Sequence, residues 1–511
     1  MRRFLFLLLL LSLVLPLSAQ TSLQFDRPFH VAGEVTWFTA YLAKPAPPKV
    51  RVVVYGADGK VTDYFFLKTD DQDRISGHFR FPYGATTSYF RFQLQALTAE
   101  DQLVSLGTFR HAVYADKRVE AQTGAATAGT GTMPAAGGLS VSTQNGQLTI
   151  AGLNGQAYSL SIVNDDVVPE NFSSHLQVAT GSATHQWKDT LFYSGTVSDT
   201  VGQPIQTNLL PFFDPATYRL FFTKADAAGA FQLELAGFED VKTIQGHDLN
   251  SNDIKVRLTL PELAPLTERP AITDAVVNYI DLSRRRKKIY QLFATVETPL
   301  EFSVAEQKRR VLDPNRDFDV QDYKAFPDMY TFFKEVAGEL RIRIRKGEYI
   351  SRLYNAPNQR FFGDTPLFIV DGKLTRNSNY INKMSPAEVE YLSFFYDNGE
   401  LRRDFPALGN NGVVQIETVR PPANFPAADA EDILTIRGLQ PAASFQPRQA
   451  EGNVPAVSPL LLWQVGAGGE DSVTLPLPTT DDYGNYRIVV VARDAQGGVR
   501  AASSRFEVAV R

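Results

Sequence analysis

The stretch that decides the fold is Pro366-Leu367-Phe368-Ile369-Val370-Asp371-Gly372, an apolar, β-rich run that ends in Asp-Gly. It is echoed by Gly409-Asn410-Asn411-Gly412-Val413-Val414-Gln415-Ile416-Glu417-Thr418, in which an Asn-Gly turn feeds an alternating run. Each pattern predicts a strand beside a turn. Between them, Ser385 as N-cap, Pro386 at the first helical position and Glu388 three residues after the cap predict a short helix over 385–392.

This order of strand, capped helix and strand resembles the plug domain of TonB-dependent outer-membrane receptors, in the form common in Bacteroidetes. The resemblance covers residues 313–422. Such receptors follow the plug with a barrel of about 22 strands, each of about 9–11 residues. After Thr418 only 511 − 418 = 93 residues remain. We therefore expect a plug-like domain without its own barrel, used for something other than closing a pore.

The first 19 residues resemble an export signal. Arg2-Arg3 precede an apolar run from Phe4 to Leu17, which ends in the small residues Ser18 and Ala19. We expect cleavage after this segment, and no other stretch is apolar for long enough to predict a transmembrane helix. The expected location is the periplasm in association with the outer membrane, and the alternative is the cell surface.

Composition excludes several kinds of chemistry. The formal net charge is -5 and 21% of residues are charged, which gives no reason to expect nucleic-acid binding. The cysteine count is zero, so disulfides, Cys-ligated zinc, a cysteine nucleophile, a lipidated N-terminal Cys and an internal thioester are all excluded. With 44% hydrophobic residues the chain can form several cores, and its length suggests three to five domains.

Residues 20–118 predict an antiparallel β-sandwich. Runs at 49–55, 61–67, 74–81 and 88–97 are β-rich and are separated by turn signals at regular intervals. The segment 29–42, where Gly-Glu precedes an aromatic strand, resembles the opening of a macroglobulin MG2 domain. The Ala/Gly/Thr-rich residues 119–138 then predict a flexible linker. A protease bait, by analogy with protease-trapping macroglobulins, is the alternative for this linker.

Residues 139–262 predict a second β region. Asn145-Gly146 joins two alternating runs, 139–143 and 147–151, and predicts a hairpin. The segment 191–231, with Gly202-Gln203-Pro204 and a later Asp-x-x-Gly-x-Phe turn, resembles a carboxypeptidase regulatory-like or macroglobulin-like sandwich. The resemblance brings no catalytic residue with it.

Residues 263–312 predict a helical connector, with Asp274 as the cap of a helix through Ser283. The helix runs into the basic cluster Arg284-Arg285-Arg286-Lys287-Lys288. One interpretation is a solvated helix end whose cations complement the helix dipole. The other is a peripheral contact with anionic lipid or an acidic partner.

The last unit, residues 423–511, predicts an Ig-like sandwich that closes with a hairpin at Gly497-Gly498. The segment Gly484-Asn485-Tyr486 and the strand after it also resemble a type IX secretion sorting domain. The expected fold class is therefore mainly β, with tandem Ig/macroglobulin-like sandwiches and an inserted α+β plug-like domain. The domain order resembles Bacteroidetes envelope proteins with MG2 and plug domains.

The search for catalytic and metal-binding motifs finds none. There is no H-E-x-x-H, nucleophile elbow, P-loop or dinucleotide fingerprint. Asp248 to Asp253 imitates a calcium loop but has Asp253 where the turn needs Gly and Thr259 where a bidentate Glu belongs. We expect no catalytic residue, no cofactor and no metal. The histidines are scattered: His30, His78, His111, His175, His185 and His247.

These observations predict a non-catalytic envelope protein that presents its plug-like domain to a protein partner at the outer membrane. The alternatives are a macroglobulin-like protease-trapping or enzyme accessory protein, and a cell-surface protein exported by type IX secretion. Two polar segments, 375–380 and 398–403, read as exposed loops. Because Arg and Tyr are enriched at interface hot spots, the expected partner-binding residues are Arg376, Tyr380, Arg402 and Arg403.

Overall fold

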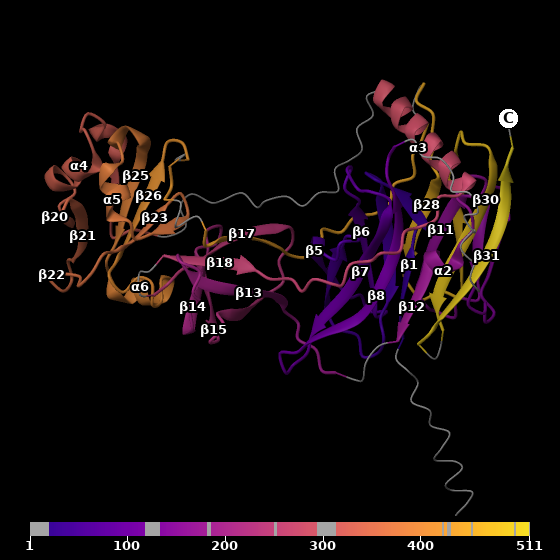
Figure 1. Ribbon diagram of the computed structural model, residues 1–511, viewed down its shortest axis with the longest axis horizontal. Coiled ribbons are helices and arrows are strands. Elements are labelled where there is room, and N and C mark those ends of the chain that lie inside the picture. The colour runs from indigo at the N-terminus through magenta and orange to yellow at the C-terminus, as the bar shows by residue number, and fades with distance from the viewer. Residues whose placement is uncertain are drawn as a thin grey trace, which may run out of the picture. The chain divides into compact units, whose positions relative to one another are not determined.

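The computed structural model describes residues 20–117, 133–180, 185–249, 253–293, 313–421, 424–426, 431–450, 453–494 and 497–509. The expected export signal and residues 119–132 of the expected linker lie outside these ranges. The fold is mainly β, which confirms the predicted class (Figure 1). Unit 1 comprises residues 1–190, 262–301 and 439–511, and unit 2 comprises 191–261 and 302–438. No helix in the described ranges is long and apolar enough to cross a bilayer.

Unit 1 begins with the predicted β-sandwich. Aromatic side chains join its two sheets, and Phe92 of one sheet lies 5.2 Å from Phe25 and 5.7 Å from Phe38 of the other, between ring centroids. The first sheet has the order β12 (Leu176–Thr180), β1 (Gln20–Phe25), β3 (Val35–Tyr41), β6 (Arg74–Arg80). The second has the order β2 (Phe29–Val31), β8 (Leu103–Tyr114), β7 (Ser88–Leu97), β4 (Lys49–Tyr55), β5 (Val61–Lys68).

A second sandwich in unit 1 combines strands that are far apart in sequence. One sheet has the order β29 (Ser472–Pro476), β10 (Gln147–Ala151), β9 (Ser140–Gln144), and the Asn145-Gly146 hairpin is confirmed by positive φ at both residues. The other has the order β28 (Leu460–Gly466), β11 (Tyr158–Asn164), β30 (Gly484–Arg493), β31 (Val499–Val508). The predicted closing hairpin at Gly497-Gly498 thus joins β30 to β31.

This pairing differs from the expected domains 139–262 and 423–511. Every residue of β11 is buried, so the strand needs a neighbour on both sides, and both neighbours come from the C-terminal segment. The residues after 190 belong to unit 2 instead. The two expected units are therefore interleaved, and the hydrophobic pattern of a strand carries no information about which distant strand it pairs with.

The helix α3 (Asp274–Leu292) packs on unit 1 through a face that includes Val276, Tyr279 and Ile280. Thr273 is its N-cap, accepting a hydrogen bond from the amide of Val276, so the predicted cap at Asp274 is displaced by one residue. The helix also continues beyond the predicted end at Ser283. The buried face continues with it, because Arg286, about one turn beyond Ser283, is also buried.

A buried ionic cluster joins α3 to the first sandwich. Arg27, which is 4% exposed, donates to Asp26 and to the hydroxyl of Tyr279. Glu34 lies 3.6 Å from the same guanidinium and accepts hydrogen bonds from Tyr279 and from Ser283. Burial opposes the charged form of Arg27, but Tyr279, Glu34 and Asp26 together raise its pKa, so the guanidinium stays charged.

Three histidines are buried near this cluster. His30 Nδ1 and His111 Nε2 share a hydrogen bond of 2.7 Å, and His175 Nε2 lies 3.2 Å from the amide nitrogen of Gln24 and from the hydroxyl of Ser161. Burial lowers the pKa of all three, and the pKa of His175 falls to about 3. The folded protein therefore keeps these imidazoles neutral at pH values where a free histidine is protonated.

Unit 2 contains a seven-stranded antiparallel sheet. Its last strand, β27, comes from the segment expected to form the C-terminal Ig-like domain and pairs with β17 through Ile244↔Leu434 and its neighbours. The order is β18 (Ile254–Leu258), β13 (Leu191–Asp199), β16 (Ala230–Leu235), β15 (Arg219–Ala225), β14 (Thr207–Asp214), β17 (Val241–Gly246), β27 (Ile433–Arg437).

The α/β part of unit 2 contains the apolar stretch 366–372. Leu367–Val370 forms β23, which lies parallel to β26 (Val413–Thr418) with Ile369 opposite Gln415. The five-stranded sheet has the order β19 (Arg316–Asp319), β25 (Val389–Phe395), β26, β23, β24 (Lys373–Thr375). A smaller sheet has the order β20 (Leu340–Arg345), β21 (Glu348–Asn355), β22 (Arg360–Phe361). The α-helices are α4 (Met329–Glu335), α5 (Ser378–Lys383) and α6 (Asn398–Asp404).

Strand β23 is apolar throughout because both of its faces are buried. Phe368 and Val370 belong to the core shared with α4, whereas Leu367 and Ile369 pack with Phe213 of the seven-stranded sheet. The Asp-Gly turn after β23 is confirmed by positive φ at both of its residues. The two predicted strands are therefore present, and they are adjacent and parallel.

The helix predicted over 385–392 is wrong. Only one turn of 3-10 helix forms, at Pro386–Glu388, and the side chain of Ser385 makes no capping hydrogen bond. From Val389 the chain becomes β25, because Leu392 and Phe394 are buried in the core while the backbone pairs with β26. Pairing with β26 therefore outweighed the local sequence pattern that predicts the start of a helix.

Two glycines provide a test of packing in the α/β part. Gly412 has φ +82°, and a Cβ there would lie 2.4 Å from Cδ2 of Leu353; Gly347 has φ +83° with open space around it. Gly347→Ala should cost about 1–2 kcal/mol for left-handed backbone alone, and Gly412→Ala about 1–3 kcal/mol more because Leu353 must move. Denaturant unfolding measures both losses, and equal losses would contradict the packing.

The buried histidines predict a loss of stability in acid. Below about pH 6.5 the unfolded chain takes up protons that the folded chain does not, so unfolding becomes easier as the pH falls toward the folded pKa values. For His175 the loss between pH 7 and pH 5 should be on the order of 2 kcal/mol. Thermal unfolding of wild type and His175→Gln across this range measures it. The variant should show a shallower dependence on pH, and identical slopes would refute the assignment.

Candidate functional site

Two of the expected partner-binding residues, Arg376 and Tyr380, make contacts within their own domain. Arg376 follows β24 and donates to the carbonyl oxygens of Thr365 at 3.0 Å and Leu408 at 2.9 Å, and burial lowers its pKa. Tyr380 lies in α5 with its ring 5.9 Å from that of Phe425, between centroids, and burial raises its pKa to about 12. Both side chains contact their own domain.

The other two residues are exposed on α6. Arg403 pairs with its neighbour Asp404, with 2.7 Å between Nη2 and Oδ2. Arg402 lines a pocket, and none of the other three does. The polar segments read as loops are largely helical, because Asn377 caps α5 and Asp397 caps α6 through their side chains. The segment 398–403 is helical throughout, and 375–380 becomes helical from Ser378.

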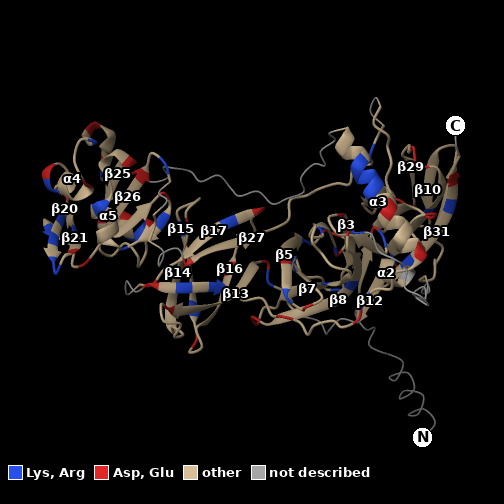
Figure 2. Cartoon of the chain, turned by 45° about the horizontal axis from the view of Figure 1, so that its top comes forward, with Lys and Arg blue, Asp and Glu red and all other residues tan. Residues whose placement is uncertain are grey.

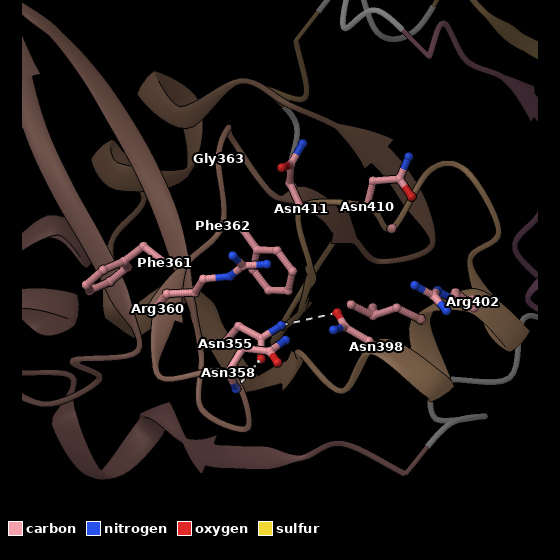
Figure 3. A pocket seen from close by; sticks show the side chains of 12 residues that line it. Asn355, Asn358, Arg360, Phe361, Phe362, Gly363, Asn398, Arg402, Asn410 and Asn411 are labelled. Carbon is pink, nitrogen blue, oxygen red and sulfur yellow. Dashed lines mark hydrogen bonds between the residues drawn. The ribbon is translucent and has the colours of Figure 1, made fainter.

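The pocket in the α/β part of unit 2 has a volume of about 480 Å³. One wall is the end of β21, the turn after it and β22; the other walls are α6 and the turn before β26 (Figure 3). Its polar side chains are five asparagines and two arginines: Asn355, Asn358, Asn398, Asn410, Asn411, Arg360 and Arg402. The remaining lining residues are Phe361, Phe362, Gly363, Leu401 and Gly409.

Hydrogen bonds between asparagines hold the floor of this pocket. Asn355 is 2% exposed and donates from Nδ2 to Oδ1 of Asn398 at 3.2 Å, while its own Oδ1 accepts from the amide of Asn358 at 3.1 Å. Figure 3 shows the Asn355–Asn398 bond between Arg360 on one side of the view and Arg402 on the other. The bond links β21 to α6 and so fixes two walls relative to each other.

The charged side chains that line the pocket are both basic. Its lining contains two guanidinium groups and no carboxylate. Arg360 and Arg402 are exposed, and within the described ranges neither forms an ion pair. Amides offer donors and acceptors, and guanidinium groups match the planar geometry of carboxylates and phosphates. The arrangement can therefore bind a ligand rich in oxygen that carries negative charge.

The polar side chains of this lining are amides and guanidinium groups, which are not the groups that general acid–base catalysis commonly uses. Within the described ranges no three His, Asp or Glu side chains are arranged to hold a metal ion. Residues 250–252 of the imperfect calcium loop lie outside those ranges.

The pocket was missed at the sequence level. The available signal was the cluster of asparagines around Arg360-Phe361-Phe362, followed later by Asn410-Asn411-Gly412. Asparagine is a common turn residue, so the sequence predicts only a turn at Asn410 and Asn411 and no binding site. Only the fold brings them beside Asn355 and α6.

The basic cluster 284–288 lies within α3 and not at its end, because the helix continues to Leu292 and its last turn has no basic residue. The expected helix end with cations that complement the dipole is therefore not formed, and the cluster is largely paired within unit 1. Lys287 lies 2.8 Å from Oδ2 of Asp116, and Arg284 lies 3.9 Å from the other oxygen of the same carboxylate. Arg286, which is 8% exposed, pairs with Asp482 at 2.6 Å. Arg285 and Lys288 are exposed. Three of the five cations therefore stabilise the fold itself.

Comparison with known proteins gives only distant likenesses. No protein-family model matches the chain, and no curated protein matches it. Among solved structures, Escherichia coli alpha-2-macroglobulin activated by porcine elastase has a TM-score of 0.25 and 10% identity over 96% of this chain. Salmonella alpha-2-macroglobulin reacted with methylamine has a TM-score of 0.24 and 10% identity over 96%. The chain spans 44% and 39% of these two proteins, respectively.

Arg376 and Arg403 should behave differently when removed. Arg376→Ala leaves two carbonyl oxygens without their donors and should lower the free energy of unfolding by about 1–3 kcal/mol. Arg403→Ala, which removes only an exposed pair, should leave stability unchanged within error. Denaturant unfolding of both variants measures this. Equal stability of both variants would mean that Arg376 has no structural role.

Proposed function

We propose that this protein is a non-catalytic binding protein of the cell envelope, whose α/β part holds an oxyanion-bearing ligand in the Asn/Arg pocket. The observation that carries the proposal is the composition of that pocket, in which seven polar side chains include two unpaired guanidinium groups and no acid. A binding site needs directional donors and a compensating charge. Both are present, supported by a buried amide-amide hydrogen bond at Asn355.

We base the scaffold role on the contacts between the α/β part of unit 2, which contains the pocket, and the seven-stranded sheet. The α/β part of unit 2 packs on a seven-stranded sheet that includes Phe213, and the amide of Gln245 donates to the carbonyl of Leu374 at 2.9 Å. The seven-stranded sheet and the α/β part therefore pack against each other and are not two loosely linked domains. In our proposal unit 2 presents the pocket, while the sandwiches of unit 1 serve as the attachment module.

The envelope location rests on the export signal over residues 1–19 and on the plug-like sequence order of 313–422. We propose the periplasm, with a protein partner at the outer membrane. Fractionation of cells and protease treatment of intact cells test this location. Protection of the protein in intact cells and digestion after outer-membrane permeabilisation would agree with it, whereas digestion in intact cells would place the protein at the surface.

The pocket can be tested with simple anions. Glucuronate and inorganic phosphate carry the two oxyanions that guanidinium groups bind, and glucose is the neutral control. Titration calorimetry should detect binding of at least one anion and none of glucose. Arg360→Gln and Arg402→Gln should each weaken it about tenfold, since a charge-assisted hydrogen bond contributes about 1.5–3 kcal/mol.

Arg403→Gln is the matched control for this test, because Arg403 is also on α6 but pairs with Asp404 and does not line the pocket. Its affinity for the anion should equal that of wild type. Absence of binding by both anions, or an equal loss in all three variants, would refute the pocket as an oxyanion site.

A further inference from the structure

Strand β20 is the open edge of the sheet β20-β21-β22. The amide of Tyr354 donates to the carbonyl of Glu339 at 2.8 Å, which fixes the alternation of hydrogen bonds along the hairpin. In an antiparallel pair every second residue exchanges hydrogen bonds with the partner strand. The peptide groups of Ile342 and Ile344 therefore point away from β21, and within the described ranges no backbone group bonds to them.

The side chains of β20 differ sharply between its two faces. Leu340 is buried and Ile342 packs against the core. The opposite face carries Arg341, Arg343 and Arg345, all exposed. Figure 2 shows the basic residues in blue along this hairpin. Successive arginines on one face lie about 6.6–6.8 Å apart along the strand.

The neighbouring strand adds to this charge. Arg352 lies opposite Arg341, and the acidic Glu348 lies opposite Arg345. Lys346 is exposed in the turn. The hairpin thus has four arginines and one lysine against a single carboxylate. Ile344 is 56% exposed at the same edge. Charges on an edge strand can guard it against aggregation. The excess of positive charge here also complements an acidic segment, and the peptide groups of Ile342 and Ile344 are open to its backbone within the described ranges.

We propose that β20 accepts an acidic, extended segment of a partner protein as an additional antiparallel strand. Residues of that segment opposite Ile342 and Ile344 would exchange backbone hydrogen bonds with them, and residues opposite the arginines would carry carboxylates. These latter positions are the non-hydrogen-bonded pairs, in which side chains lie closest. This inference rests on the binding role proposed above. The edge of β20 adjoins the Asn/Arg pocket, because the guanidinium of Arg341 lies 5.5 Å from the ring centroid of Phe361, which lines that pocket. The edge itself does not include Arg360 or Arg402.

The probe is a nine-residue peptide, blocked at both ends, in which glutamate and valine alternate. Fluorescence polarisation with full-length protein should show binding that weakens as salt is added. A second peptide carries N-methyl groups on its valines, whose N–H groups would face β20. It keeps every charge but loses the backbone donors, so it should bind at least tenfold more weakly.

The protein variants separate charge from strand pairing. Replacing Arg341, Arg343 and Arg345 together by Gln should weaken peptide binding about tenfold or more, because three exposed ion pairs are lost. Ile344→Pro keeps all the arginines but removes an edge donor, and it should also weaken binding. Arg219→Gln, on β15 of the same unit, is the control for a general change in charge and should bind like wild type. Circular dichroism checks that each variant is folded.

Other outcomes would overturn the proposal. Equal affinity for the plain and N-methylated peptides would mean that charge alone attracts them, without strand pairing. Binding of phosphatidylglycerol vesicles through the three arginines, with no binding of the peptide, would assign this surface to a lipid headgroup layer. The double variant Arg360→Gln/Arg402→Gln should leave peptide binding unchanged, so that failure of the pocket and failure of this edge are distinguishable.

Discussion

Unit 1 depends on one buried charge, the guanidinium of Arg27. It lies between Asp26, Glu34 and the hydroxyl of Tyr279, and it joins the first sandwich to a helix that begins at residue 274. A buried cation of this kind is tolerable only when all of its partners are in place, and the loss of one leaves an uncompensated charge. The position of α3 is therefore fixed by electrostatics as well as by the apolar face around Ile280.

Unit 1 is built from segments that are far apart in sequence. The helix α3 supplies the hydroxyl of Tyr279 to Arg27 of the first sandwich, and β28 and β30 pair with the two edges of the central strand β11. Unit 2 occupies the intervening sequence in two pieces. The chain is thus a pair of interleaved bodies, although its local patterns resemble a linear series of domains.

Local patterns predicted local structure well. The strands at 49–55 and 88–97 and the hairpin at Asn145 were found from alternation and turn chemistry, which act between near neighbours. The helix expected at Ser385 failed because pairing with β26 outweighed its cap signal. The pairing between strands of 139–262 and strands of 423–511 was not predicted, because partner choice between distant strands leaves no trace in one sequence. For the same reason the sequence predicts an exposed Arg376, whereas its side chain donates hydrogen bonds to two carbonyl oxygens. The pocket around Asn355 was likewise not predicted.

The interleaving of unit 1 also sets the order in which the chain can fold during synthesis. Strand β11 ends at Asn164, yet its neighbour β28 begins only at Leu460. At about 5–20 residues per second, the ribosome needs on the order of 15–60 s to deliver that partner. For this interval a strand that is buried along its whole length in the finished protein has both edges open. Unit 1 can therefore be completed only after the last segment of the chain has been made.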